Sequence, residues 1–293
     1  MKQNQEERLN PLNDYMFQKC MGEKGDEEQL LDFLNAVLGY SGDYKLSSVE
    51  ILENKTFLAD TLGKKACILD VRAVVADGTK VNIEVQLNTF KDMDKRILFY
   101  WSKEFVETLD SGEQYRQLPK VIVINILDFN LIPTEKIKEY HTSFHIREDK
   151  HTEYKLTDIL EIHCIEMLKF HQLENKNKEN PLHKWLIMFD WRTNMEMINE
   201  ITQKDAAAKS FQEKFNAVSR DPQEMRLYFL REMARLDYNS GIDDARTEGR
   251  REGMIEGEQK RNIEIAKKMK SQGISVEQIN QWTGLSNKEI EKI

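Results

Sequence analysis

The chain has 293 residues, of which 40% are hydrophobic and 32% are charged, and its formal net charge is −8. This length allows one large domain or two smaller ones. The negative charge excludes a general basic field that would attract nucleic acid, so a site for a polyanion has to be local or assisted by a metal ion.

Cysteines and apolar segments indicate the cellular compartment. Cys20, Cys67 and Cys164 lie far apart and form no CxxC motif, so we interpret them as buried, reduced thiols. The N-terminal stretch MKQNQEERLNPLNDYMF has no apolar core of the kind found in signal peptides. No run approaches the roughly 18 apolar residues of a membrane span. We expect a soluble, cytoplasmic protein with no membrane partner.

The first part of the chain mixes helical and strand patterns. Asn13-Asp14 opens a helix, and a second helix is expected over about 27–38 before Gly39. Strand signals and one amphipathic helix follow. The strands are expected over 48–57, 66–76, 80–88, 121–127, 141–154 and 162–168, and the helix over about 91–109. The run VIVINIL at 121–127 is typical of a strand that is buried on both faces.

A polar run, HQLENKNKENP at 171–181, is the best boundary in the chain. Beyond it the pattern is helical only, with helices expected over about 181–200, 205–217 and 221–238. We therefore expect an α/β domain over 1–172, a helical region over 181–240 and a helical tail over 241–293.

The stretch ILDVRAVVADGTKVNIEVQ, residues 68–86, predicts a hairpin with an acid in each strand. A two-residue Asp77-Gly78 turn would place Asp70 and Glu84 on opposite faces. A three-residue loop over 76–78 with a glycine bulge places Asp70 directly opposite Glu84 and separates polar from apolar residues almost completely. We therefore predict the three-residue loop.

Directly opposed carboxylates repel each other, and when half-buried they need a shared proton or a cation. Two carboxylates at this spacing suit Mg²⁺, which takes oxygen ligands and keeps waters for its substrate. Such an ion activates water and neutralises phosphate, as phosphodiester hydrolysis requires. The competing interpretation is a strand face that is polar simply because it faces water.

Thirteen residues separate Asp70 from Glu84-Val85-Gln86. This pattern resembles the PD-(D/E)XK nuclease signature, with Gln in the usual Lys place and Leu69 in the place of the proline. More specifically, the chain resembles the Rpn family of recombination-promoting nucleases and transposases in five segments that follow the family's order. These are NPLNDYMFQKCMG (10–22), ILDVRAVVADGTKVNIEVQ (68–86), KRILFYWSKEF (95–105), GEQYRQLPKVIVINILDF (112–129) and EIHCIEMLKF (161–170).

The resemblance implies a restriction-endonuclease-like α/β fold, a mixed sheet flanked by helices, followed by an all-helical C-terminal region. It also implies Mg²⁺-dependent DNA cleavage, with Mn²⁺ as a substitute, and a role in recombination. By position, Asp70 and Glu84 become the metal ligands, and Gln86 takes the Lys place. An amide there orients water or donates a hydrogen bond but supplies no charge.

Three further residues are candidate contacts to substrate or metal. Asp14 lies on the first helix, where nucleases of this fold often place an extra acid, although it also suits a plain helix cap. Arg96 and Tyr100 lie four residues apart on the helix after the hairpin, where they would reach DNA phosphate unless this is only a solvated face. His141 and His145 have helical metal spacing, but their region has a strand pattern, so we expect no metal there.

The tail allows two interpretations. Gly249, Gly253 and Gly257 strip side chains from one helix face, which favours close self-association, while a flexible linker is the alternative. Residues 265–293 resemble a small helix-turn-helix with turns at Gly273 and Gly284, although docking or dimerisation suits it equally.

The first hypothesis is a metal-dependent DNA endonuclease that forms a homodimer. The second is a nuclease-fold module that binds DNA or protein without cleavage, and the third is an assembly protein driven by its tail.

Overall fold

The computed structural model describes residues 8–53, 70–108 and 114–293. Within them lies a mixed sheet of six strands in the order β1-β2-β3-β4-β6-β5. The strands are β1 Val49–Leu52, β2 Val71–Val75, β3 Lys80–Gln86, β4 Val121–Leu127, β5 His141–Phe144 and β6 Leu160–Glu166. Strands β3, β4 and β6 are parallel to one another, and the other pairs are antiparallel. Cys67, Leu69 and parts of the strands expected over 48–57 and 66–76 lie outside the described residues.

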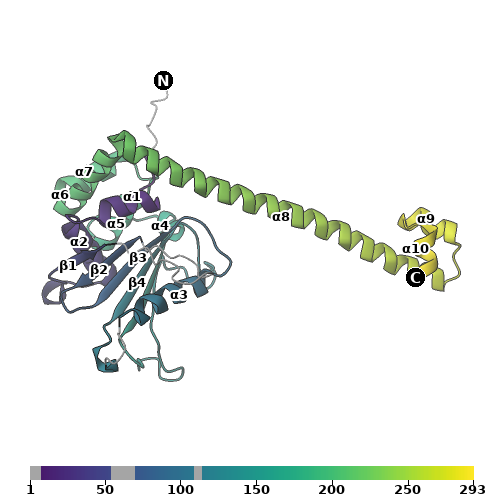
Figure 1. Ribbon diagram of the computed structural model, residues 1–293, viewed down its shortest axis with the longest axis horizontal. Helices are drawn as coiled ribbons and strands as arrows, with labels where there is room; N and C mark the ends of the chain where they lie inside the picture. The colour runs from purple at the N-terminus through teal and green to yellow at the C-terminus, as the bar shows by residue number, and fades with distance from the viewer. Residues whose placement is uncertain (1–7, 54–69, 109–113) are drawn as a thin grey trace. The chain divides into compact units, whose positions relative to one another are not determined.

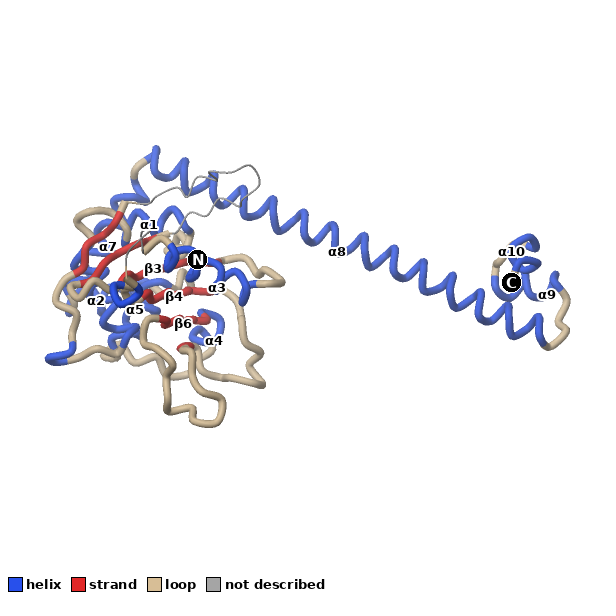
Figure 2. Tube along the Cα trace, turned by 60° about the horizontal axis from the view of Figure 1, so that its bottom comes forward, coloured by secondary structure: helices blue, strands red, loops and turns tan. Residues whose placement is uncertain are grey.

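Helices flank this sheet, so the expected α/β class is confirmed (Figures 1 and 2). They are α1 Asp14–Met21, α2 Glu27–Leu38, α3 Met93–Val106, α4 Met167–His171, α5 Pro181–Phe189, α6 Met195–Lys204, α7 Ala206–Arg220, α8 Pro222–Ser271, α9 Val276–Thr283 and α10 Asn287–Lys292. Short 3₁₀ turns occupy Gly42–Tyr44 and Tyr115–Gln117. No helix in the described ranges is both long and apolar enough to cross a membrane.

The main hydrophobic core lies between one face of the sheet and helices α1, α2, α5 and α7 (Figure 1). The sheet contributes alternate residues, such as Val71, Ile83 and Ile124, because side chains on a strand point to opposite faces in turn. Edge-to-face aromatic contacts join the helices to one another. They include Phe17–Phe189, Phe33–Trp185 and Phe189–Phe211. The helical region after residue 181 therefore completes the core of the sheet domain.

Helix α3 packs on the opposite face of the sheet. Met93 and Ile97 of α3 join a smaller core with Leu127 and Cys164 from strands β4 and β6. Strand β4 is buried at all seven positions, which confirms that VIVINIL is an interior strand. The polar face of the hairpin lies on this α3 side, so helix and sheet enclose part of it.

The chain divides into two compact units, Met1–Met233 and Ala234–Ile293. The second unit ends in a small helical core of Ala266, Ile279, Leu285 and Ile290. Gly273 and Gly284 have φ values of 78° and 72°, and they form the turns on either side of α9. The three-part division expected from the sequence stays a prediction.

Three expected elements differ in extent. The strand expected over 141–154 ends at Phe144, because the Glu148 carboxylate accepts hydrogen bonds from two following backbone amides and forms a turn. The helix expected over 181–200 is two helices, since Asp190 ends α5 and the Asn194 side chain caps α6. The helix expected over 221–238 continues to Ser271 through the glycines.

Candidate active site

The hairpin of β2 and β3 has the predicted three-residue loop. Val75 N–H donates to the Thr79 carbonyl at 3.0 Å, Gly78 N–H donates to the Val75 carbonyl at 2.8 Å, and Gly78 has a φ of 84°. Val71 pairs with Ile83, so one further step of the same register brings Asp70 opposite Glu84. The sequence prediction for this loop is therefore confirmed.

Asp70 and Glu84 form an acid pair in which Glu84 is buried and Asp70 is half-buried. The backbone N–H of Val85 donates to Asp70 Oδ2 at 2.6 Å, and Glu84 is 6% exposed. Burial, with a smaller contribution from the charge of Asp14, raises the pKa of Asp70 to about 7. Burial and the charge of Asp70 raise the pKa of Glu84 well above its usual range. The pair therefore holds protons that a cation would have to displace.

Helix α3 covers the rest of the polar face, so the interpretation of that face as simply water-exposed is wrong. Arg72 Nη2 lies 2.9 Å from Glu104 Oε1 on α3, and both side chains are almost fully buried. Asn82, beside Arg72 in the register, is 1% exposed. Buried polar groups of this kind need internal partners, and the ion pair supplies them for Arg72.

Arg96 and Tyr100 lie on α3 as expected. The Arg96 guanidinium lies 4.7 Å from the Phe90 ring centre and 4.9 Å from that of Tyr100. Its positive charge lowers the pKa of both Asp70 and Glu84. The two aromatic rings thus hold a cation beside the acid pair.

Asp14 lies in the first turn of α1, and Asn13 is the N-cap, because its side chain accepts hydrogen bonds from the N–H groups of Tyr15 and Met16. The Asp14 carboxylate lies 3.8 Å from Arg231 Nη1 of α8. Arg231 also lowers the pKa of Asp70. Nothing in the sequence pattern placed Arg231 near the hairpin, since only tertiary packing brings α8 to α1.

Gln86 is the last residue of β3 and is partly buried. Strand alternation places it on the same face as Glu84, two residues further along. Its backbone carbonyl accepts from the N–H of Asp128 at 3.0 Å, which fixes the strand end. Gln86 is therefore the next residue after Glu84 on the face of β3 that carries the acid pair.

Asn125 lies in the apolar run VIVINIL, and it was not predicted as a site residue from the sequence. It pairs with Glu84 in the parallel register of β3 and β4, and it is fully buried. A single asparagine in a run of β-branched residues is the one sequence signal that marks this position. The α3 face of the sheet thus carries Asp70 directly before β2, Glu84 on β3 and Asn125 on β4.

The acid pair fits a divalent cation. Glu84 Oε1 is buried and has no hydrogen-bond partner among the described residues, and carboxylate oxygens are the ligands that Mg²⁺ and Mn²⁺ accept. No group of three or more His, Cys, Asp or Glu in the described part of the chain is arranged to hold a metal ion. Asp70 and Glu84 would therefore supply the carboxylates, and other oxygens would complete the coordination.

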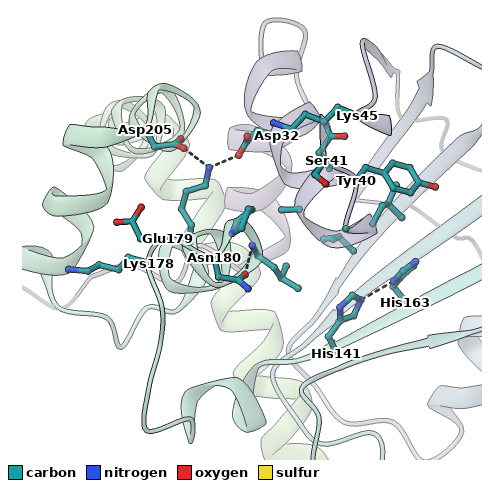
Figure 3. Close-up of a pocket in the computed structure, with 18 of the residues that line it drawn as sticks. Asp32, Tyr40, Ser41, Lys45, His141, His163, Lys178, Glu179, Asn180 and Asp205 are labelled. Atoms are coloured by element: carbon teal, nitrogen blue, oxygen red, sulfur yellow. Dashed lines mark hydrogen bonds and ion pairs between the residues drawn. The ribbon is translucent and has the colours of Figure 1, made fainter. Parts of the chain in front are cut away.

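A separate pocket of about 920 Å³ opens on the other face of the sheet (Figure 3). Lys184 inside it binds both Asp32 and Asp205, at 2.6 and 2.5 Å. His141 Nε2 lies 2.9 Å from His163 Nδ1, and His163 Nε2 lies 2.8 Å from Glu161. The charges that line the pocket are thus paired largely with one another.

A family model described as PD-(D/E)XK nuclease family transposase matches residues 11–245 of the chain. The match includes the whole sheet, the acid pair and the beginning of α8. A search of curated proteins gave no match, and neither did a search of solved structures.

Proposed function

The chain belongs to the PD-(D/E)XK nuclease family transposases, and from that premise we propose that it is a Mg²⁺-dependent DNA endonuclease. The observation that carries this proposal is the acid pair of half-buried Asp70 and buried Glu84, which face each other in the hairpin and have raised pKa values. A site of this kind holds protons without a metal and binds a divalent cation in their place.

Asp70 and Glu84 would hold the metal ion, with Mn²⁺ as an accepted substitute for Mg²⁺. When bound, the ion supplies an activated water and neutralises charge on the phosphate. Gln86 would orient the attacking water through its amide. The side chain contributes position and no charge, in contrast to the Lys that is usual at this place.

Arg96, Tyr100 and Arg231 would bind the DNA backbone. Arg96 and Arg231 act electrostatically on Asp70 from α3 and α8, so both lie where a phosphate near the metal would need neutralisation. Arg231 is more than half exposed, which leaves its guanidinium accessible to DNA. These local cations suit a protein whose net charge is −8.

We place the protein in the cytoplasm and propose that it forms a homodimer. Cys20 and Cys164 are free, buried thiols, which suits a reducing compartment. The dimer is supported by apolar side chains that α8 leaves exposed, such as Leu236, Ile242 and Ile255.

Nicking of supercoiled plasmid tests the proposed activity. We expect the purified protein to nick plasmid with Mg²⁺ or Mn²⁺ and to stop when EDTA is added, and we expect Asp70→Ala, purified identically, to be inactive. Equal activity in both proteins would mean a contaminant or another site. Plasmid binding without nicking would support the alternative of a nuclease-fold binding module, which the Gln86 side chain favours.

A further inference from the structure

Asn125 lies on β4, which is buried at every position and therefore on both faces. Its neighbours in the register are Glu84 on β3 and Cys164 on β6. Neighbouring strands lie about 4.8 Å apart, so the side chains of Glu84 and Asn125 stand side by side on the same face.

The amide of Asn125 is fixed on one side only. Its Nδ2 donates to the backbone carbonyl of His163 on β6 at 3.1 Å. The two polar atoms of an amide diverge from Cγ, so this bond turns Oδ1 away from the His163 carbonyl. Oδ1 is buried and has no hydrogen-bond partner in the described chain.

Two buried acceptor atoms, on residues that pair in the register of β3 and β4, thus have no hydrogen bond. Glu84 Oε1 also has no hydrogen-bond partner among residues 8–53, 70–108 and 114–293, and a buried acceptor left in this way has a free-energy cost. A proton on Glu84 or a cation between the two oxygens removes that cost. The amide oxygen of asparagine is a ligand for hard divalent cations, as carboxylate oxygens are.

We propose that Asn125 Oδ1 is the third protein oxygen of the metal centre, beside Asp70 and Glu84, either directly or through a bound water. This rests on the proposed metal site of the nuclease. It agrees with the finding that no group of three or more His, Cys, Asp or Glu among the described residues is arranged to hold a metal ion.

Asn82 provides a matched control. It is buried to the same degree, lies on the same face, and its amide atoms have no hydrogen-bond partner within the described residues. However, its partner in the register is Arg72 and not an acid. The two asparagines therefore share residue type and burial, but only Asn125 pairs with an acid of the proposed metal site.

The test is Mn²⁺ binding to the full chain, measured by calorimetry and by electron paramagnetic resonance, with no DNA present. We expect Asn125→Leu to weaken the Kd for Mn²⁺ at least tenfold, Asn82→Leu to change it less than twofold, and Asn125→Asp to tighten it. Circular dichroism shows whether each variant is folded. If Asn125→Leu does not fold, Asn125→Ser is measured in its place, with the same expected loss.

Wild-type affinity in a folded Asn125→Leu or Asn125→Ser protein would overturn this inference. Asp70→Asn separates that result from failure of the proposed function. If Asp70→Asn loses Mn²⁺ while the Asn125 variants keep it, the acid pair stands and Asn125 is not a ligand. If Asp70→Asn binds Mn²⁺ like the wild type, both proposals are wrong.

Discussion

At the residue scale, the chemistry of the site follows from where three oxygen-bearing side chains stand in the sheet. Glu84 lies on β3 between Asp70 and Asn125 in the register, and it is buried. Its position on an inner strand removes water, while the neighbouring Asp70 adds like charge. Both effects favour protons or a divalent cation over free carboxylates.

The raised pKa of Asp70 predicts a pH-dependent stability. Protonated Asp70 stabilises the metal-free fold, and this contribution is complete below the unfolded pKa of about 3.9 and is lost as the pH rises through about 7. We expect Asp70→Asn to gain about 2–4 kcal/mol in the free energy of unfolding relative to wild type between pH 4 and pH 8. Urea unfolding in EDTA over this range measures the difference. Parallel stability curves for the two proteins would contradict the prediction.

We expect substitutions of Gln86 to change the nicking rate without changing the affinity for the metal ion. Because its amide would orient water and not bind the ion, Gln86→Ala should lower the nicking rate about 10- to 100-fold while the Kd for Mn²⁺ stays unchanged. Gln86→Lys should raise the rate above wild type, since an ammonium group adds charge stabilisation. A full rate in Gln86→Ala would remove Gln86 from the site.

At the element scale, helix α3 completes the site by covering the hairpin. It supplies Glu104 to Arg72 and brings Arg96 beside the acids. The sequence predicted a helix over 91–109, but it did not predict that this helix covers the polar face of the β2–β3 hairpin. Polar and apolar residues alternate along the strands in the same way whether the polar face is exposed to water or covered by a helix, so the pattern does not distinguish the two.

The buried pair of Arg72 and Glu104 predicts a large stability effect. Glu104→Ala leaves a buried guanidinium without its carboxylate and should cost about 3–5 kcal/mol. The double variant Arg72→Met with Glu104→Leu should recover most of that loss, because it removes both buried charges. Chemical denaturation of the three proteins measures this. A loss below about 1 kcal/mol in Glu104→Ala would show that the pair is solvated.

The sequence predicted this site where local rules decide the structure. Alternation and the Asp77-Gly78 turn determined the register that opposes Asp70 and Glu84, because a slip by one residue would bury the polar face in the main core. Contacts between distant segments were not predictable in this way. Arg231 lies near Asp14 only because α8 packs beside α1. Asn125 lies in a run whose other residues are apolar and contribute to both hydrophobic cores.

At the scale of the whole molecule, the first compact unit carries the sheet and the acid pair, and the second carries α8 from Ala234 onward with α9 and α10. Gly249, Gly253 and Gly257 lie within the continuous helix, and open space surrounds the position of a Cβ on each. The flexible-linker interpretation of this segment is therefore wrong. A helix face without side chains suits close contact with a second helix, as the proposed homodimer requires.

Removal of residues 241–293 tests the tail. We expect the full chain to have the mass of a dimer and the shortened chain that of a monomer, because the shortened chain lacks the glycine-bearing segment. Light scattering after size-exclusion chromatography measures both masses. A full chain that is monomeric, or a shortened chain that stays dimeric, would exclude this role for the tail.

The most direct test of the proposed metal nuclease centre compares two isosteric variants in Mg²⁺-dependent plasmid nicking. Glu84→Gln removes the charge of the buried acid, while Glu161→Gln changes a buried glutamate on the opposite face of the sheet. Both proteins are first shown to be folded. We predict that Glu84→Gln loses at least a thousandfold in rate and that Glu161→Gln stays within a few-fold of wild type. Nicking by Glu84→Gln at the wild-type rate would contradict the assignment of the acid pair.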